Sequence, residues 1–541
     1  MEYVKQKKSP IFIALIQWFI TTVFQVDRLF FTYEYENKYF LGTKFLYLIF
    51  LLVSWCFIFE AVKKIKAGDQ NWKRGFFVFK VYLFITMFFL LILWPGTWAW
   101  DDVFTLNGLS QYNQWYSWQH IITGAYQDVL LQILPFPGGI ILLQNVLISL
   151  CVAFTVTRLE AIFGIGMMKN KVLDTIVKLL PFLLPPVLSY QFSGYRIGFY
   201  VYIELVMLVM MIGIQNDQDE WDIRYLILFC VLCVVVSVWR TESFFYIPCA
   251  FLLVLSAPKS VISNKKKILC ILLLIIGIQG INKFQNSELE NADYEVISLM
   301  RPCVELVRAA DCTEDADVLR EIDRVVSLEV IHNNPVMNGE GLYWSTDVVK
   351  ESYSDEDYKA FLKAIVKLSI KYPKVVFAER WNIFIHGSGV TGGSVTNIGS
   401  ASSLFDAGND NSAAQIVQSK EWIANSPVFK TARKTVINAL GMRIRKSDGS
   451  YISVLQRLVW NAIIPELILM YAWFKLLIEK KWHWLGICTA VLIRIPVVIL
   501  TQPAHWFMYM LSFYFLGYIF LIYRILVFWS IHKKEIGFRT G

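Results

Sequence analysis

The chain has 541 residues, of which 56% are hydrophobic, 16% aromatic and only 17% charged, and its mean hydropathy is +0.49. Soluble globular proteins carry more charge than this. The composition therefore excludes a soluble globular protein and predicts a polytopic protein embedded in a lipid bilayer. The net charge of +8 does not indicate a nucleic-acid partner, because the lysines lie in short loops between hydrophobic segments, where they act as topology signals.

Hydrophobic segments recur along most of the chain, and about twelve of them suit a hydrocarbon core about 30 Å thick. We therefore predict an all-α fold with about twelve transmembrane helices. The first segment is short and weak. In chain order the segments lie at 10–25, 40–61, 75–95, 137–157, 173–189, 197–214, 223–239, 243–257, 267–283, 453–478, 483–500 and 506–528.

The distribution of basic residues predicts the orientation of these segments. If the N-terminus is cytoplasmic, the basic clusters fall in inside loops and the short outside loops have almost none. The clusters lie at 63–74, 158–171, 265–267, 480–481 and 533–534. We expect a multi-pass protein of the cell membrane with both termini in the cytoplasm and a first segment that is not cleaved as a signal peptide.

The spacing of the segments divides the chain into three parts. Residues 1–283 form an N-terminal membrane domain whose first outer loop is 96–136, and residues 453–541 form the C-terminal membrane helices and a cytoplasmic tail. Between them lies an extracytoplasmic domain, 284–452, which is mostly helical and precedes the last three spans. The sequence of this domain is compatible with a disulfide between Cys303 and Cys312 and also with two free thiols.

The first outer loop carries the first group of candidate site residues. The hydrophobic run "LILWPGTWAW" ends directly before Asp101 and Asp102, and Gln119, His120 and Thr123 follow in the same loop. One interpretation makes the acids reactive groups that face a membrane-bound substrate. The alternative is a solvated loop in which Asp102 caps a short helix that begins near Val103.

Two later outside turns also carry polar residues. "VWRTESF" places Arg240 and Glu242 between two spans, and "TQPAHWFMY" places Gln502 and His505 in the last outside turn. Ionisable groups near the hydrophobic zone tend to face an internal cavity, which favours a functional site. For Arg240 the alternative is an interfacial arginine that anchors the turn and pairs with Glu242.

These residue types fit transfer of a sugar from a lipid phosphate. A carboxylate can take the proton from an attacking hydroxyl, and a second carboxylate can orient the first or share a divalent metal with it. An arginine binds phosphate through two parallel hydrogen bonds, which a lysine cannot do. Asp101, Asp102 and Arg240 are therefore the central candidates.

The order of the motifs points to a family. A hydrophobic span is followed by "PGTWAWDD", then by His120, then by a span containing "LLQNVLISL"; "WRTES" and "TQPAHWFMY" come later. This order resembles the GT-C superfamily of multispanning glycosyltransferases, in particular the bacterial branch that modifies surface polysaccharides. The chain departs from that pattern at His120, because Ile121 stands where related proteins often have proline.

The resemblance implies an inverting hexosyltransferase that uses a polyprenyl-phosphate sugar as donor and a cell-surface glycan as acceptor, on the extracytoplasmic face. Asp101 or Asp102 would be the general base. The donor phosphate or substrate would contact Arg240, Glu242, His120, Gln119 and His505. The resemblance does not imply a definite cofactor, since some members of the superfamily use a divalent cation and others do not. Binding of Mg²⁺ or Mn²⁺ by Asp101 and Asp102 is therefore kept as an alternative.

Three other classes remain as alternatives. A transporter or flippase would show inverted repeats and broken helices with polar residues near the middle of the membrane. A polymerase or ligase for lipid-linked saccharides would rely on arginines and a histidine in a large outer loop. A scaffold would use its outer domain for binding only.

Overall fold

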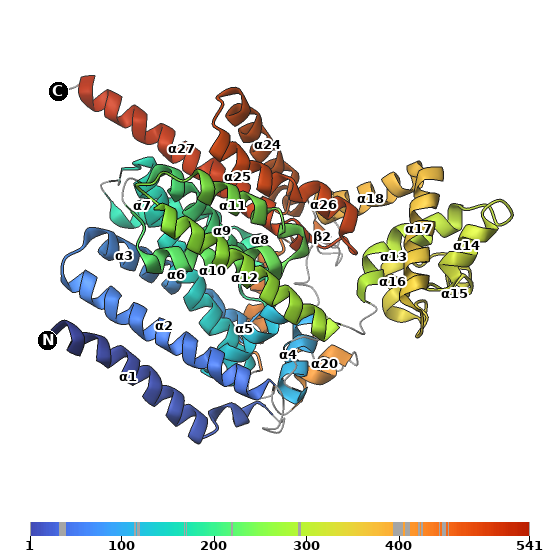
Figure 1. Ribbon diagram of the computed structural model, residues 1–541, viewed down its shortest axis with the longest axis horizontal. Coiled ribbons are helices and arrows are strands. Elements are labelled where there is room, and N and C mark those ends of the chain that lie inside the picture. The colour runs from blue at the N-terminus through green and yellow to red at the C-terminus, as the bar shows by residue number, and fades with distance from the viewer. Residues whose placement is uncertain are drawn as a thin grey trace. The chain divides into compact units, whose positions relative to one another are not determined.

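The computed structural model describes most of the chain (Figure 1). The described residues are 2–31, 39–112, 115, 120–166, 168, 170–217, 220–289, 294–392, 404–405, 412–419, 422, 426–442, 444–445, 451–452 and 454–539. They form two compact units. The first comprises Met1–Glu288, Thr396–Leu492 and Leu511–Gly541, and the second comprises Leu289–Val395 and Ile493–Met510. The predicted insertion 284–452 is therefore divided between the two units.

Helices provide almost all of the regular structure in this part of the chain. The strand pairing is limited to a short antiparallel hairpin, β1 (Ile444–Arg445) with β2 (Tyr451–Ile452), and to one bridge between Val326 and Val349. The prediction of a helical, multi-pass architecture is confirmed at this level. Within the described residues, eight helical segments are long and hydrophobic enough to span a membrane: α2 (Phe40–Lys66), α3 (Gln70–Leu93), α6 (Pro137–Phe163), α9 (Arg196–Asn216), α12 (Asn264–Leu289), α23 with α24 (Val454–Val459 and Ile463–Ile478), α25 with α26 (Trp482–Leu492 and Arg494–Thr501) and α27 (Leu511–Arg539).

A further hydrophobic pair is sharply bent. The segment formed by α7 (Lys171–Leu179) and the 3₁₀ turn η2 (Leu180–Leu183) meets α8 (Pro185–Gln191) at 74°. The bend falls at Leu184, whose backbone is extended (φ −62°, ψ 136°), because a following proline disfavours the helical conformation. The shorter hydrophobic helices are α1 (Glu2–Val23), α5 (Ile121–Leu131), α10 (Ile223–Trp239) and α11 (Tyr246–Ser256).

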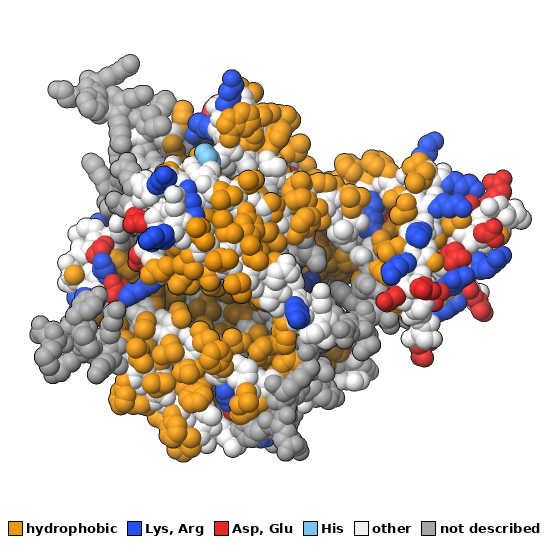
Figure 2. All heavy atoms as spheres, viewed as in Figure 1, with side chains coloured by type: hydrophobic (Ala, Val, Ile, Leu, Met, Phe, Trp, Pro, Cys, Tyr) orange, Lys and Arg blue, Asp and Glu red, His pale blue; other side chains and the backbone are white. Residues whose placement is uncertain are grey.

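The membrane helices of the first unit have one exposed and one packed face. Large side chains such as Phe45, Phe84 and Phe88 are exposed, and Figure 2 shows hydrophobic side chains spread over this surface. On the packed side, α3 contacts α6, and α6 contacts α9, whose side chains are nearly all buried. A surface of this kind suits contact with lipid tails.

A buried ionic network joins three of these helices at their ends. The Arg74 guanidinium of α3 lies 2.7 Å from the Glu160 carboxylate of α6 and 2.8 Å from the Asp174 carboxylate of α7. The Lys178 ammonium contacts the same two carboxylates at 2.7 and 2.9 Å. Two cations and two anions neutralise one another, so the network explains how charged side chains are accommodated in this buried place.

The rest of the first unit consists of short elements within the predicted outer loops and of segments from elsewhere in the chain. It contains η1 (Val26–Leu29), α4 (Trp100–Tyr112), η3 (Thr241–Ser243), α20 (Ser412–Val417) and α22 (Lys430–Leu440). Helix α20 packs on α4, where Trp422 meets Trp98 edge to face with ring centroids 5.1 Å apart. Residues far apart in the sequence thus cover the helix that carries the paired acids.

The second unit is a helical domain with its own hydrophobic core. Val304, Ile322, Leu342 and Phe361 are fully buried there. Ser354 and Asp357 form a capping box at the start of α17. The unit comprises α13 (Tyr294–Ala309), α14 (Ala316–Asp323), α15 (Leu328–Asn333), α16 (Gly339–Ser345), α17 (Asp355–Lys371), α18 (Pro373–Gly387), α26 and η4 (Phe507–Tyr509).

Candidate functional site

The turn before the paired acids is stabilised by close packing and by hydrogen bonds to residues distant in the sequence. Gly96 has φ +117°, a conformation open to glycine, and a Cβ atom there would lie 2.7 Å from the Phe192 carbonyl oxygen. The Thr97 N–H donates to that same carbonyl at 2.8 Å. The buried Arg433 donates to the Gly96 carbonyl at 2.6 Å and to the Leu93 carbonyl at 3.3 Å. The position of the following helix is therefore well defined.

Asp102 is a buried residue in the first turn of α4. One carboxylate oxygen accepts the Ala99 N–H at 2.7 Å, as an acid at this position of a helix commonly does, and the other accepts the Gly194 N–H at 2.9 Å. Burial raises the pKa of Asp102 well above its usual range, against the opposing effect of the hydrogen bond from Ala99. Asp102 thus fastens α4 to the start of α9. The sequence allowed Asp102 as the cap of a helix from about Val103; the helix instead begins at Trp100, and Asp102 binds the Ala99 N–H from within its first turn.

Gly194 is where the two segments approach most closely. A Cβ atom there would lie 2.5 Å from the Trp98 ring and 2.9 Å from the Asp102 Cβ. Its carbonyl accepts a hydrogen bond from the Gln127 side chain of α5 at 2.9 Å. Gly194 therefore joins α4 and α5 to the segment that leads into α9.

Asp101 has a different environment from its neighbour. It also lies in the first turn of α4, but it is only half-buried, and its negative charge contributes to the raised pKa of Asp102. Its backbone carbonyl accepts the Thr105 hydroxyl at 2.8 Å. Of the two acids, Asp101 is the less buried.

His120 lies at the start of α5 and acts as its N-terminal cap. Its Nδ1 accepts the Ile122 N–H at 3.3 Å, so the proton of the neutral ring is on Nε2. Burial lowers the pKa of His120 to about 4, and the positive charge of Arg196, the first residue of α9, lowers it further in the same direction. His120 and Arg196 are therefore close enough to interact electrostatically.

We expect His120 to stay neutral through the physiological range. Because the folded-state pKa is depressed, His120 stabilises the fold fully above its unfolded pKa of about 6.5, and this contribution is lost as pH falls through about 4. The check is a ¹⁵N-histidine NMR titration, in which His120→Asn identifies the signal among the six histidines and retains a capping side chain. A titration midpoint near the ordinary histidine value would contradict the assignment.

Arg240 and Glu242 form a buried ion pair, 3% and 6% exposed, in which the Arg240 Nε donates to the Glu242 carboxylate. This is the pairing that the alternative interpretation predicted. The Arg240 guanidinium also lies over the Tyr200 ring of α9, 5.9 Å from its centroid. The neighbouring Trp239 indole donates to the Thr123 hydroxyl of α5 at 2.7 Å.

The structure thus brings several predicted residues together around the N-terminal end of α9. Asp102 contacts Gly194, His120 faces Arg196, and Arg240 lies against Tyr200. Sequence reasoning missed Arg196. The signal was present, since this arginine stands directly before a predicted span at its outer end.

Two predicted site residues are not part of this arrangement. Gln119 lies outside the described residues. His505 belongs to the second unit, where its Nδ1 lies 3.4 Å from the Arg301 guanidinium and its ring stacks on Trp506.

Asp101 and Asp102 do not fit a divalent metal. Both Asp102 oxygens already accept backbone N–H groups, and only 1% of the residue is exposed. Within the residues that the structure describes, no three His, Cys, Asp or Glu side chains converge as metal ligands would.

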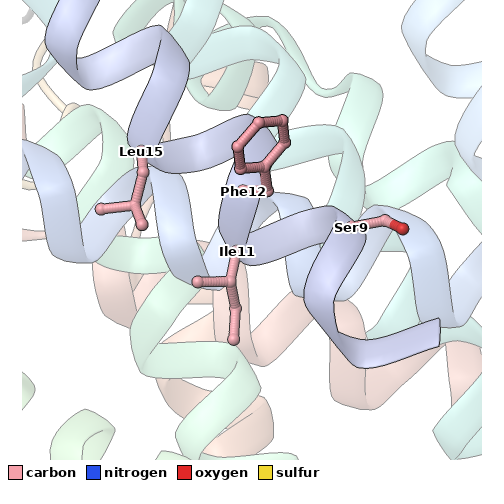
Figure 3. Close-up of a pocket in the computed structure, with 4 residues that line it drawn as sticks. All are labelled: Ser9, Ile11, Phe12 and Leu15. Atoms are coloured by element: carbon pink, nitrogen blue, oxygen red, sulfur yellow. The ribbon is translucent and has the colours of Figure 1, made fainter. Parts of the chain in front are cut away.

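A depression on α1 has none of the chemistry of a site. Figure 3 shows its lining, which consists of Ser9 and the hydrophobic side chains Ile11, Phe12 and Leu15. The three hydrophobic side chains are 44–62% exposed on a helix of membrane character. This surface suits a lipid chain.

Comparison of the chain with protein-family models, curated proteins and solved structures gives no match.

Proposed function

We propose that the protein is a membrane glycosyltransferase that moves a sugar from a polyprenyl-phosphate donor to a cell-surface polysaccharide on the extracytoplasmic face, with inversion. The observation that supports the proposal is the contrast between two adjacent acids at the start of α4: Asp102 is buried and fixed by two backbone N–H groups, whereas Asp101 is only half-buried. The two hydrogen bonds of Asp102 fix the first turn of α4 and with it the backbone of Asp101, and a general base needs such a defined position.

In the proposed reaction, Asp101 removes the proton from the attacking hydroxyl of the acceptor. The hydroxyl oxygen then forms a bond to the anomeric carbon, and the bond between that carbon and the phosphate oxygen breaks. The electron pair leaves with the polyprenyl phosphate. The base is therefore needed only on the acceptor side, because phosphate is a good leaving group.

Arg196 is the proposed contact for the donor phosphate. It is partly exposed at the N-terminal end of α9, where the helix dipole also favours negative charge. Arg240 is already paired with Glu242 and is buried, so we assign it to holding the turn between α10 and α11. The lipid tail would lie between the spans.

The proposal includes a topology of twelve spans with both termini in the cytoplasm. Besides the eight long segments, α1, the bent α7–α8 pair, α10 and α11 would cross the membrane. This count places the start of α4, the turn after α10 and the second unit on the same outer side, in agreement with the positive-inside rule.

A native cysteine tests this orientation. Cys312 is exposed in the second unit and Cys303 is buried, and both are free thiols. We expect a membrane-impermeant maleimide to label intact cells at Cys312, and Cys312→Ser to remove that label. Labelling of Cys312 only after cell lysis would place the second unit inside and would contradict the proposed topology.

The function itself is tested on the glycan. Surface polysaccharide purified from cells with and without the protein should differ by one side-chain sugar, with an intact backbone. Unchanged polysaccharide composition would refute the proposal.

A transporter or flippase is the second candidate, and two observations favour it. The α7–α8 pair is a broken hydrophobic segment, and Glu204 of α9 is fully buried, with its carboxylate oxygens accepting the Tyr246 and Ser512 hydroxyls at 2.7 Å each. Loss of a flippase would trap lipid-linked sugar on the cytoplasmic side. Loss of the transferase would leave it on the outer side.

A further inference from the structure

Helix α18 of the second unit is joined to the end of a membrane span. The segment formed by α25 and α26 is long and hydrophobic enough to cross a bilayer and ends at Thr501, and α18 packs against α26 (Figure 1). The buried Arg380 of α18 donates to the Gln502 carbonyl, directly after that span, and to the Ser298 carbonyl of α13, at 2.9 Å each. Because a span of this length ends near a bilayer surface, α18 is held at that surface.

One side of α18 carries two large aromatic side chains that are not buried in the unit. Phe377 is 69% exposed and Trp381 is 47% exposed, and because they are four positions apart they share one face of the helix. Their rings stack, with centroids 6.1 Å apart and an angle of 9° between the planes. Ile383 and Phe384 of the same helix are buried, so other side chains of α18 contribute to the interior of the unit. We call the exposed pair, Phe377 and Trp381, the α18 aromatic face.

The chemistry of the α18 aromatic face matches the headgroup region of a bilayer. Tryptophan is enriched where membrane proteins meet this region, because its ring is apolar and its N–H is polar. Lys374 is exposed one helical turn before Phe377. A lysine side chain at such a position can lay its methylene groups along apolar surface and place its ammonium group among lipid phosphates.

The lipid-facing surface of the span reaches the same end of α26. Leu500, in the last turn of α26, is 63% exposed, as a side chain in contact with lipid tails is. Two residues later, the Gln502 carbonyl accepts the hydrogen bond from Arg380, which directly precedes Trp381 in the sequence. One hydrogen bond therefore connects the end of the lipid-facing span to the helix turn that carries the aromatic face, and this identifies the bilayer as what covers that face.

We propose that the α18 aromatic face is a membrane-docking surface, in which Phe377 and Trp381 insert into the headgroup region at the end of the α25–α26 span and hold the second unit on the bilayer. Its partner is the phospholipid bilayer. The inference rests on α25 and α26 crossing the membrane. It does not depend on sugar transfer or on the side of the membrane that the second unit faces.

The test is EPR spectroscopy of the full-length protein in phospholipid nanodiscs large enough for two copies. Cys56→Ser and Cys312→Ser remove the exposed native thiols, and a nitroxide is attached to the new thiol of Phe377→Cys or, in a second protein, of Trp381→Cys. Each label should collide more often with oxygen, which concentrates in lipid, than with a water-soluble nickel chelate. Adding Trp381→Glu to the labelled Phe377→Cys protein should reverse that preference, because a charged side chain is costly in the apolar region.

Val336→Cys is the matched control, because Val336 is a 98% exposed hydrophobic residue of the same unit, between α15 and α16. Its label should prefer the nickel chelate. The inference is overturned if the labels at Phe377 and Trp381 also prefer the chelate, or if neither reagent reaches them, which would indicate a cover of protein. It is equally overturned if Trp381→Glu leaves the preference at Phe377 unchanged, or if spin–spin broadening shows that a second copy of the chain covers the face.

Discussion

Replacing Asp101 with asparagine should abolish sugar transfer while leaving the amount of protein in the membrane unchanged. Asparagine has nearly the same shape but cannot accept the proton of the acceptor hydroxyl, and general-base catalysis contributes about 10²- to 10⁴-fold to a rate. Because Asp101 is half-buried and asparagine keeps the size of its side chain, the fold should tolerate the change. The measurement is the side-chain sugar content of purified surface polysaccharide.

Asp317→Asn provides the matched control for this experiment. Asp317 has the same chemistry, but its side chain is 91% exposed in the second unit. It should leave the glycan unchanged. A normal glycan in cells that carry only Asp101→Asn would show that Asp101 is not the base.

Replacing Asp102 with alanine should destabilise the protein. The Ala99 and Gly194 N–H groups would both remain buried without their acceptor, at a cost of about 1–3 kcal/mol each. The check is the midpoint of thermal unfolding in detergent. Asp101→Ala, one residue away, keeps both hydrogen bonds and should unfold close to the wild type, so equal shifts for the two variants would refute this structural role of Asp102.

Asp102→Asn adds a pH test of the same residue. The folded-state pKa of Asp102 is raised, so the neutral form is favoured in the fold. The contribution of Asp102 to stability is therefore full below its unfolded pKa and is lost as pH rises through its folded pKa. The stability advantage of the wild type over Asp102→Asn should shrink as pH rises, and an advantage that grows would contradict the pKa direction.

The spans and the local caps could be predicted because they depend on neighbouring residues. Long hydrophobic runs predicted α2, α3 and α6. A short helix beside Asp102 was also foreseen, but it begins at Trp100 and not near Val103, so Asp102 lies within its first turn and not at its cap. The Arg240–Glu242 pair was foreseeable because the residues are two positions apart. Such features depend on local spacing, which the sequence displays directly.

The remaining contacts join residues that are distant in the sequence. Gly194 binds Asp102 across 92 positions, and His505 reaches Arg301 across 204. No spacing rule connects such pairs, because they meet only when separate helices pack. For the same reason the sequence alone did not show that 493–510 belongs with the helical domain or that Arg196 faces His120.

The hydrogen bonds from Arg433 to the turn before α4 have a consequence for biosynthesis. During translation, α3 and the turn that follows it are made long before Arg433, which lies 337 positions after Gly96. The Leu93 and Gly96 carbonyls must therefore wait for this partner while most of the polypeptide emerges from the ribosome. The turn before Asp101 and Asp102 is consequently completed late in assembly, so a nascent chain halted before α22 would lack the hydrogen bonds that hold this turn.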